Sequence, residues 1–233
     1  MTSDEVEYVE IARAQSERGE LVLRERRPAD GGPTSLELRA NGVFVMDTVE
    51  VSSEREMARA ALALVEAPAA VVVGGLGLGY TMHEVLADSR VEKCAVVEIE
   101  PALVDWLRSG LVPEGPALLA DERVTVVVAD IAVALQEARA ASYDLVLLDV
   151  DNGPGYLVHS ANAALYEAPA LTEARRVLRP GGALVVWSAD EAPELQESLR
   201  TVFGEVEAQP HAVRLQERDE HYWLYVARVA SDG

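Results

Sequence analysis

Hydrophobic and polar residues alternate in three short stretches near the start of the chain. Turn residues separate these stretches, among them Asn41-Gly42, a pair that favours tight hairpin turns. Alternation with a period of two on both sides of such a turn predicts antiparallel β-hairpins. The stretches are residues 20–25, 35–39 and 42–46.

A helix is predicted to follow the hairpins. Ser53 can cap its N-terminus, and Glu56 stands three residues later, which is the spacing of a capping box. The helical pattern runs to about Glu66. Residues 1–66 are therefore expected to form an N-terminal β-hairpin region with a linking helix.

From residue 69 onward, short apolar runs alternate with stretches of helical periodicity. Continuous apolar strands between helices indicate a parallel sheet that is covered on both faces. Two last candidate strands, near residues 205–209 and 222–229, would close the sheet with an antiparallel edge. Residues 67–233 are therefore expected to form a doubly wound α/β domain with a mostly parallel, seven-stranded sheet. The other strands are 69–73, 94–97, 124–128, 145–148 and 183–187, and the helices 80–88, 101–110, 131–140, 161–178 and 191–202.

Composition narrows the class of protein. The chain has 233 residues, of which 49% are hydrophobic, and can build a core without disulfides or a structural metal. Its one cysteine, Cys94, can form neither a disulfide framework nor a cysteine-rich zinc site. The acidic N-terminus has no signal-peptide core, and no apolar stretch has membrane-spanning length. We therefore expect a cytoplasmic protein that is not bound to membranes.

The net charge of the chain indicates which kinds of ligand it can attract. Its 40 acidic residues against 20 basic ones give a formal net charge of −20. Such a field repels a phosphate backbone, so no nucleic-acid partner is expected. A small cationic substrate would be attracted, although acidity can also serve solubility alone.

A glycine-rich segment, Gly74-Gly75-Leu76-Gly77-Leu78-Gly79, follows the first apolar strand and leads into a helix. Its glycines let the backbone pass close to a ligand and leave helix N-terminal amides free for an anion. The spacing Gly75-x-Gly77-x-Gly79 is the methyltransferase form, whereas a dinucleotide fingerprint would need a glycine at Tyr80. We therefore predict that Gly75, Gly77 and Gly79 bind a cofactor, the alternative being a tight turn that binds nothing.

Single carboxylates follow the next two strands. Glu98 ends the second strand, where a carboxylate can accept both ribose hydroxyls of a nucleoside. The alternative for Glu98 is a strand end that faces solvent. Asp130 follows the third strand, where it can take an adenine amino group or cap the helix that begins at Ile131.

The fourth strand leads into Asp149-Val150-Asp151-Asn152-Gly153-Pro154. Two carboxylates at the mouth of a buried strand are unfavourable for folding unless something binds there. The carboxyl ends of parallel strands meet at one edge, which is where open α/β sheets bind ligands. Asp149 is therefore expected beside the glycine loop, in contact with the cofactor.

Other side chains are weaker candidates. Tyr156, His159 and Tyr166 follow the loop and could line an acceptor pocket, although a lone His after a loop is more often structural or exposed. Trp187 ends the fifth strand and could close over a ligand or pack under the sheet. No cluster of ligating side chains has metal-site spacing, so no metal is expected, and no Ser or Cys lies in a nucleophile motif.

Taken together, these segments resemble the spermidine synthase family, within the Rossmann-like, AdoMet-dependent methyltransferase fold (AdoMet is S-adenosyl-L-methionine). The resemblance implies AdoMet or decarboxylated AdoMet as the cofactor and a homodimer as the assembly. It also implies that Asp149 is the catalytic aspartate, with Asp151 as a second candidate. The segments are VVVGGLGLGYTMHEVL, VVEIEP, VVVADI, YDLVLLDVDNGP and LYEAPALTEARRVLRPGG.

The chain departs from the family pattern in three ways. The family has an aspartate in place of Gly77 that helps to hold the aminopropyl end of decarboxylated AdoMet, so its absence favours a cofactor that keeps its own carboxylate. Spermidine synthases bring Gln, Tyr and His to the polyamine from the helix before the first strand, and residues 16–79 contain none of these. The family's catalytic loop is also two residues longer and carries a second aspartate.

These observations favour an AdoMet-dependent methyltransferase that acts on a small, amine-bearing substrate. The sulfonium activates the carbon, so the protein mainly holds a neutral nucleophile in line, with Asp149 as general base. The alternative is an aminopropyltransferase with a rearranged acceptor pocket. A second alternative is a non-catalytic, nucleoside-binding regulatory protein.

Overall fold

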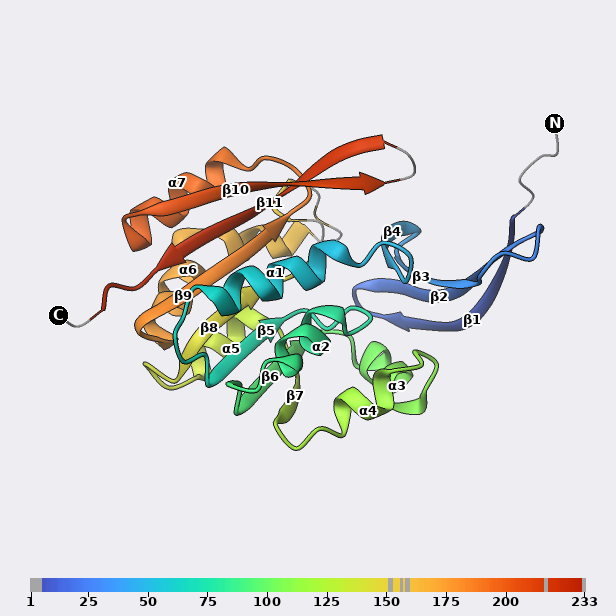
Figure 1. Ribbon diagram of the computed structural model, residues 1–233, viewed down its shortest axis with the longest axis horizontal. Coiled ribbons are helices and arrows are strands. Elements are labelled where there is room, and N and C mark those ends of the chain that lie inside the picture. The colour runs from blue at the N-terminus through green and yellow to red at the C-terminus, as the bar shows by residue number, and fades with distance from the viewer. Residues whose placement is uncertain (1–5, 151–152, 156, 158–159, 216–217, 232–233) are drawn as a thin grey trace.

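The computed structural model describes residues 6–150, 153–155, 157, 160–215 and 218–231. It contains two β-sheets: an antiparallel sheet of four strands and a mixed sheet of seven strands. The smaller sheet projects from one end of an α/β body that is built on the larger sheet (Figure 1).

The N-terminal sheet has the strand order β1-β2-β3-β4. The last three strands agree with the predicted hairpins, and Asn41 and Gly42 take the left-handed backbone, with φ of 52° and 76°, at the turn between β3 and β4. The first strand was not predicted, because its side chains are only half-buried or exposed and its polar residues do not alternate regularly. The strands are Val6–Ser16 (β1), Gly19–Pro28 (β2), Ser35–Ala40 (β3) and Val43–Asp47 (β4).

Helix α1, Ser52–Ala63, joins the two sheets. The predicted capping box is wrong: the N-cap is Val51, and it makes no side-chain capping hydrogen bond. Because the helix begins at Ser52, Ser53 already lies in the first turn, and its hydroxyl donates to the carboxylate of Glu54, 2.6 Å away. The helix also ends three residues before the predicted Glu66.

The seven-stranded sheet confirms the predicted fold class. Its order is β10-β11-β9-β8-β5-β6-β7, in which the neighbours from β9 to β7 are parallel and β10 and β11 form the antiparallel edge. The strands are Ala70–Gly74 (β5), Lys93–Glu98 (β6), Val124–Val128 (β7), Tyr143–Leu148 (β8), Leu178–Ser188 (β9), Val206–Leu215 (β10) and Arg218–Arg228 (β11).

Helices cover both faces of this sheet. Helices α1 to α4 belong to one hydrophobic cluster and α5 to α7 to the other, so the sheet is buried between two layers. The helices after α1 are Tyr80–Ala87 (α2), Pro101–Ser109 (α3), Gly115–Leu119 (α4), Ile131–Glu137 (α5), Ala168–Val177 (α6) and Pro193–Phe203 (α7).

Two helical segments differ from the prediction. The single helix expected at 161–178 divides into a 3-10 helix, Ser160–Tyr166, and α6, because Pro169 lies at the start of α6 and cannot continue a preceding helix. The short helix α4 was not predicted, since five residues between loops carry no periodic signal. Within the described residues, no helix is long and apolar enough to cross a membrane.

The N-terminal sheet and the α/β body share one hydrophobic core. Leu23, Leu38 and Met46 of the small sheet belong to the same cluster as Leu76 and Leu78, which follow β5. The division of the chain at residues 66 and 67 therefore stays a prediction. This packing places the small sheet over the carboxyl end of β5.

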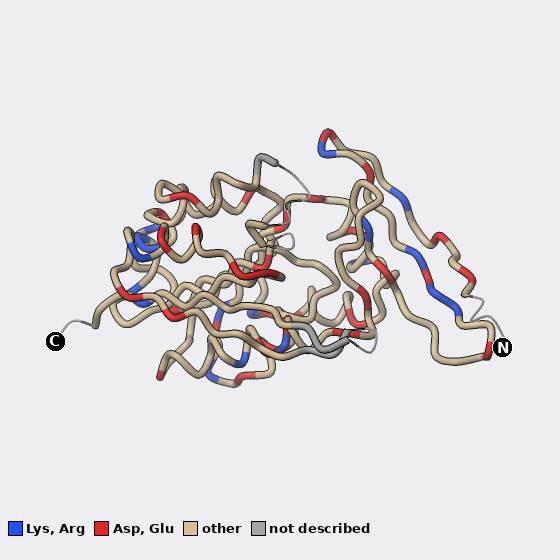
Figure 2. Tube along the Cα trace, turned by 90° about the horizontal axis from the view of Figure 1, so that it is seen from above, with Lys and Arg blue, Asp and Glu red and all other residues tan. Residues whose placement is uncertain are grey.

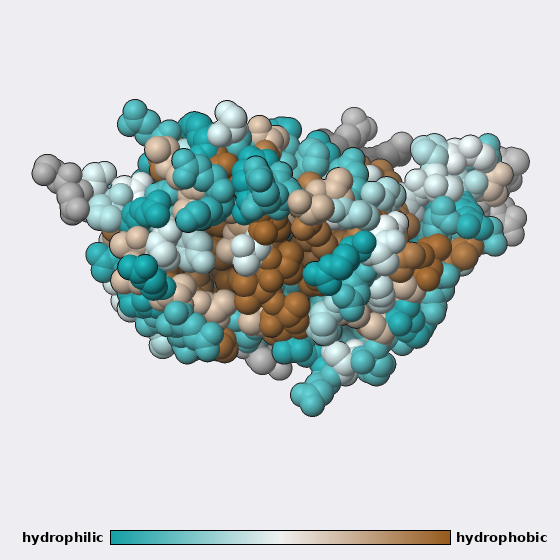
Figure 3. All heavy atoms as spheres, turned by 90° about the horizontal axis from the view of Figure 1, so that it is seen from below, coloured by the Kyte–Doolittle hydropathy of each residue, from teal (hydrophilic) through white to brown (hydrophobic). Residues whose placement is uncertain are grey.

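Charged residues occur along the whole chain, whereas apolar surface gathers on one face. Acidic residues occur on both the body and the small sheet, interspersed with fewer basic ones (Figure 2). Seen from below, apolar surface gathers in the middle of the molecule (Figure 3). The edge strand β7 lies low in the view of Figure 1 and ends at Val128, which is 52% exposed.

Candidate functional site

A cavity of about 220 Å³ opens at the carboxyl ends of β5, β6, β7 and β8. Its other wall comes from α1 and from β2, β3 and β4 of the small sheet. Five of the six residues predicted to bind the cofactor line this one cavity: Gly75, Gly77, Glu98, Asp130 and Asp149. The parallel sheet brings them together because each follows a strand at the same edge.

The glycine loop is held tightly by its surroundings. A Cβ atom on Gly75, where φ is 97°, would lie 2.0 Å from the carbonyl oxygen of Asp149. A Cβ on Gly77, where φ is 50°, would lie 2.7 Å from the sulfur of Met46. Gly79 lies outside the lining of this cavity and starts α2. Of the three predicted glycines, Gly75 and Gly77 therefore reach the cavity.

Glu98 stands at the end of β6 and is only 7% exposed, so the alternative of a solvent-facing strand end is wrong. Its carboxylate accepts hydrogen bonds from the backbone N–H groups of Leu76, at 2.9 Å, and Glu100, at 2.8 Å. Burial raises the pKa of Glu98 in spite of these donors. The side chain is thus fixed beside the glycine loop, with lone pairs left for ligand hydroxyls.

Asp130 caps a helix, which is one of the two roles considered for it, and also lies at the cavity. Its side chain accepts a hydrogen bond from the N–H of Ala132, at 2.8 Å, and so caps α5. It also lines the cavity, together with Ile131 and Ala132. Contact with an adenine amino group, the other role considered for Asp130, stays a prediction.

Asp149 follows β8 and faces the glycine loop. Its N–H donates to the carbonyl of Gly74, at 2.9 Å, and its Oδ2 accepts from the hydroxyl of Thr81, at 2.7 Å. Burial raises the pKa of Asp149, and the Thr81 hydrogen bond opposes that shift only in part. Thr81 is not among the residues predicted from the sequence, although its place just after the glycine loop is a usable signal.

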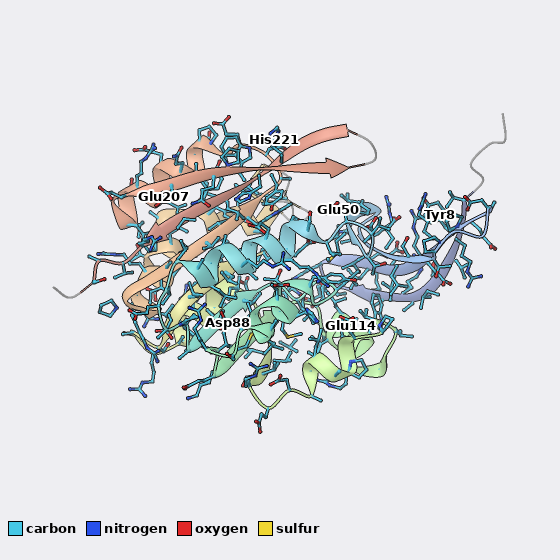
Figure 4. All side chains as sticks on the ribbon, viewed as in Figure 1. Tyr8, Glu50, Asp88, Glu114, Glu207 and His221 are labelled. Atoms are coloured by element: carbon cyan, nitrogen blue, oxygen red, sulfur yellow. The ribbon has the colours of Figure 1, made fainter. Side chains whose placement is uncertain are left out.

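Glu54 also lines the cavity and is also not among the residues predicted from the sequence. It lies in the first turn of α1, at the end of the helix where Figure 4 labels Glu50, between the small sheet and the body. Burial, and then the nearby charge of Asp149, raise the pKa of Glu54 to about 7. No local pattern marks this residue, because only the docking of α1 on the sheet turns it toward the cavity.

The aromatic candidates lie in different places. Trp187 lines the cavity and its ring also stacks on Tyr222, with centroids 6.2 Å apart, so it both packs on the sheet and faces the ligand space. Tyr166 is only 5% exposed, and its hydroxyl donates to the carbonyl of Val150, at 2.8 Å. Tyr166 therefore supports the loop after β8 from within the core.

Three predicted candidates, Asp151, Tyr156 and His159, lie outside the described residues. Their roles stay predictions. Within the described ranges, no group of three or more His, Cys, Asp or Glu side chains is placed to hold a metal ion.

The sequence profile of the spermine/spermidine synthase domain matches residues 38–209. The chain belongs to this family. The matched region contains Glu54 and every carboxylate described above, together with the glycine loop.

Relatives of the chain carry out two kinds of transfer. The chain is 34% identical over 117 residues, 49% of its length, to putrescine N-methyltransferase 3 of Nicotiana tabacum, and it covers 29% of that protein. It is 31% identical over 150 residues, 60% of its length, to polyamine aminopropyltransferase 2 of Pseudomonas aeruginosa, and it covers 41% of that protein. The chain therefore spans less than half the length of these relatives.

Among solved structures, a spermidine synthase in complex with the transition-state analogue AdoDATO has the same fold. It superposes with a TM-score of 0.79 at 17% identity, covering 96% of this chain and 75% of the other. At this identity the likeness concerns the fold.

The raised pKa of Glu54 predicts a pH-dependent stability difference. A carboxyl group whose pKa rises from 4.5 to about 7 on folding loses stabilising free energy as the pH increases through this range. Glu54→Gln removes that loss, so the variant should be more stable than the wild type by about 2–3 kcal/mol at pH 8, with a much smaller difference at pH 5. Urea unfolding at both pH values measures this.

Glu56→Gln is the matched control, because Glu56 lies on the same helix but not in the cavity lining. It should change stability by a similar small amount at both pH values. Parallel stability curves for Glu54→Gln and the wild type would show that the Glu54 carboxyl is not perturbed by the cavity.

Proposed function

We propose that this protein is an AdoMet-dependent methyltransferase that transfers a methyl group to a small, amine-bearing molecule. The observation that carries the proposal is the arrangement within one cavity. Glu98 provides a carboxylate for ribose hydroxyls on the β6 side, and Asp149 provides a carboxylate for an amine on the β8 side. Between them, at Gly77, there is no side chain.

The cavity fits a sulfonium nucleoside in three respects. Glu98 is held by two backbone N–H groups and can accept hydrogen bonds from vicinal hydroxyls. Asp130 and Ile131 at the β7 side offer an acceptor for an amino group and an apolar surface for an adenine ring. Gly75 and Gly77 bring the backbone close to the middle of the ligand.

The place of Gly77 favours AdoMet over its decarboxylated form. In the spermidine synthase pattern, an aspartate at this position helps to hold an aminopropyl amine. Here the sulfur of Met46 occupies the space that a side chain at position 77 would need, 2.7 Å from its Cβ, and also accepts the N–H of Leu78. The carboxylate of AdoMet would therefore meet no like charge at Gly77.

In this proposal the bound cofactor supplies a methyl carbon that the sulfonium already activates. Asp149 orients the acceptor nitrogen toward that carbon and takes up its proton, a general-base role that its raised pKa supports. Thr81 fixes the carboxylate of Asp149 through its hydroxyl. Leu21, Leu38 and other apolar side chains of the small sheet cover the cavity and limit access of water.

An aminopropyltransferase is the second candidate function. The 31% identity to a polyamine aminopropyltransferase over 60% of the chain favours it. Both candidates are transferases with a small cationic acceptor, and the acidic character of the chain suits either. A cytoplasmic location and a homodimeric assembly complete the proposal and rest on the sequence analysis.

The choice of cofactor tests the proposal directly. We expect AdoMet to bind more tightly than decarboxylated AdoMet, because Gly77 offers no carboxylate to an aminopropyl amine. NAD should not bind, because the glycine spacing lacks the third dinucleotide glycine. Titration calorimetry with the three compounds decides between these outcomes. If decarboxylated AdoMet binds more tightly and putrescine is consumed, the methyltransferase proposal is wrong and the protein is an aminopropyltransferase.

Glu98→Gln tests the ribose contact. The substitution keeps the shape but removes the charge, so nucleoside affinity should fall by about 1–3 kcal/mol, the usual loss for a charge-assisted hydrogen bond. Calorimetry with AdoMet and a thermal unfolding curve measure binding and folding separately. An unchanged affinity would mean that Glu98 serves only the backbone of the glycine loop.

Asp149→Asn tests the proposed role of Asp149 as the general base. Turnover should fall by about 10² to 10⁴-fold, because the amide keeps the shape but loses the basicity, while the glycine loop and Glu98 still hold the nucleoside part of the cofactor. Asp151→Asn is the control and should have the smaller effect on methyl transfer from labelled AdoMet. If Asp151→Asn abolishes turnover and Asp149→Asn does not, the catalytic aspartate is Asp151. If neither matters, proximity to the sulfonium carbon is the better account.

A further inference from the structure

Two carboxyl groups from distant parts of the chain share the cavity. Glu54 comes from the first turn of α1, and Asp149 comes from the end of β8. Each has one hydroxyl donor: Ser53 for Glu54, at 2.6 Å, and Thr81 for Asp149, at 2.7 Å. Within the described part of the chain, no cationic side chain forms an ion pair with either of the two carboxyl groups.

The basic residue next to Glu54 in the helix forms no ion pair with it, although it stands over Tyr80, which also lines the cavity. Arg55 lies next to Glu54 in the chain, and its guanidinium stands over the ring of Tyr80, 5.5 Å from the centroid. Glu50 adds a further negative charge near Glu54 and contributes to its raised pKa. Two partly buried carboxyl groups without a cation are unfavourable in one cavity, and a bound cation offsets this.

An aromatic side chain lines the same cavity as this pair. Trp187 lines the cavity, and its indole N–H is buried without a hydrogen-bond partner in the described structure. Its ring stacks on Tyr222, which in turn stacks on His211 with centroids 5.1 Å apart. Aromatic faces and carboxylates together form the usual surroundings of a bound ammonium group.

We propose that Glu54 is an amine-binding residue of this site, and that Glu54 and Asp149 together hold one primary ammonium group against Trp187. The inference rests on the proposed transferase function. It adds Glu54 as a residue that binds the positively charged ammonium group. The ammonium belongs to the acceptor or to the amino group of the cofactor's amino-acid end, and both have the same chemistry.

If the ammonium group belongs to the acceptor, the two carboxylates also provide a base for the proton that the acceptor nitrogen must lose. The ammonium R–NH₃⁺ gives one proton to a carboxylate of the pair, which becomes a carboxylic acid. The neutral nitrogen then forms a bond to the methyl carbon as the carbon–sulfur bond breaks, and that electron pair remains on the sulfur of the thioether. The product leaves as R–NH₂⁺–CH₃, so charge and atoms balance.

Binding without turnover tests the proposal. The probes are putrescine, titrated into protein saturated with S-adenosylhomocysteine, and, separately, S-adenosylhomocysteine and 5′-methylthioadenosine, which lacks the amino-acid end. The proteins are the wild type, Glu54→Gln, Glu54→Asp and the control Glu56→Gln, each checked for folding by thermal unfolding. Calorimetry at pH 8 gives the affinities.

If the acceptor supplies the ammonium, Glu54→Gln should weaken putrescine binding at least tenfold and leave both nucleosides within twofold. Glu54→Asp, which keeps the charge, should lose less. If the cofactor supplies the ammonium group, Glu54→Gln should weaken the binding of S-adenosylhomocysteine at least tenfold. The affinity for 5′-methylthioadenosine should not change. Glu56→Gln should stay within twofold of the wild type in every titration.

The proposal is overturned if Glu54→Gln changes neither putrescine nor S-adenosylhomocysteine binding, or if it weakens 5′-methylthioadenosine as strongly as S-adenosylhomocysteine. A wild type that does not bind putrescine, with S-adenosylhomocysteine binding unaffected by Glu54→Gln, overturns it as well. Methyl transfer from labelled AdoMet is measured separately on the wild type. Its absence, with ammonium binding intact, would contradict the methyltransferase and leave the role of Glu54 standing.

Discussion

The close contact between the backbones of Gly75 and Asp149 is the constraint on which the site depends. The N–H of Asp149 donates to Gly74, and a Cβ at Gly75 would lie 2.0 Å from the carbonyl oxygen of Asp149. Only glycine permits this approach, because its φ of 97° and the missing side chain are both required. The contact fixes the loop after β8 against the loop after β5. It thereby positions Asp149 next to the glycine loop, to which Glu98 is hydrogen-bonded from the other side.

Burial outweighs local hydrogen bonding in the electrostatics of the cavity. Glu98 has two backbone donors and Asp149 has a hydroxyl donor, yet burial raises the pKa of both. Glu54 shows the same balance with the charge of Asp149 added. Several carboxyl groups whose pKa is raised by burial, in a chain with a net charge of −20, favour the cationic ligand that we propose.

Much of the fold could be predicted from the sequence because it is encoded locally. The apolar run before Gly74 and the glycines after it mark β5 and its turn without knowledge of any other segment. Once the strands are known to be parallel, their carboxyl ends must meet at one edge, so Glu98, Asp130 and Asp149 could be placed in one site. The half-exposed strand β1 escaped prediction, since an edge strand with irregular polarity gives no such signal.

Tertiary packing decided the rest. Whether Glu54 faces solvent or the cavity depends on the rotation of α1 against the sheet. The helical pattern does not contain this rotation. It suggested a capping box of Ser53 and Glu56 instead. The space at Gly77 depends on Met46 from the small sheet, thirty-one residues away in the chain. The sequence by itself thus determined the sheet, its glycine turn and the carboxylates at its edge, because strand ends are local features. Only the tertiary structure decided which side chains from other elements complete the cavity, because such contacts are set by how the layers pack.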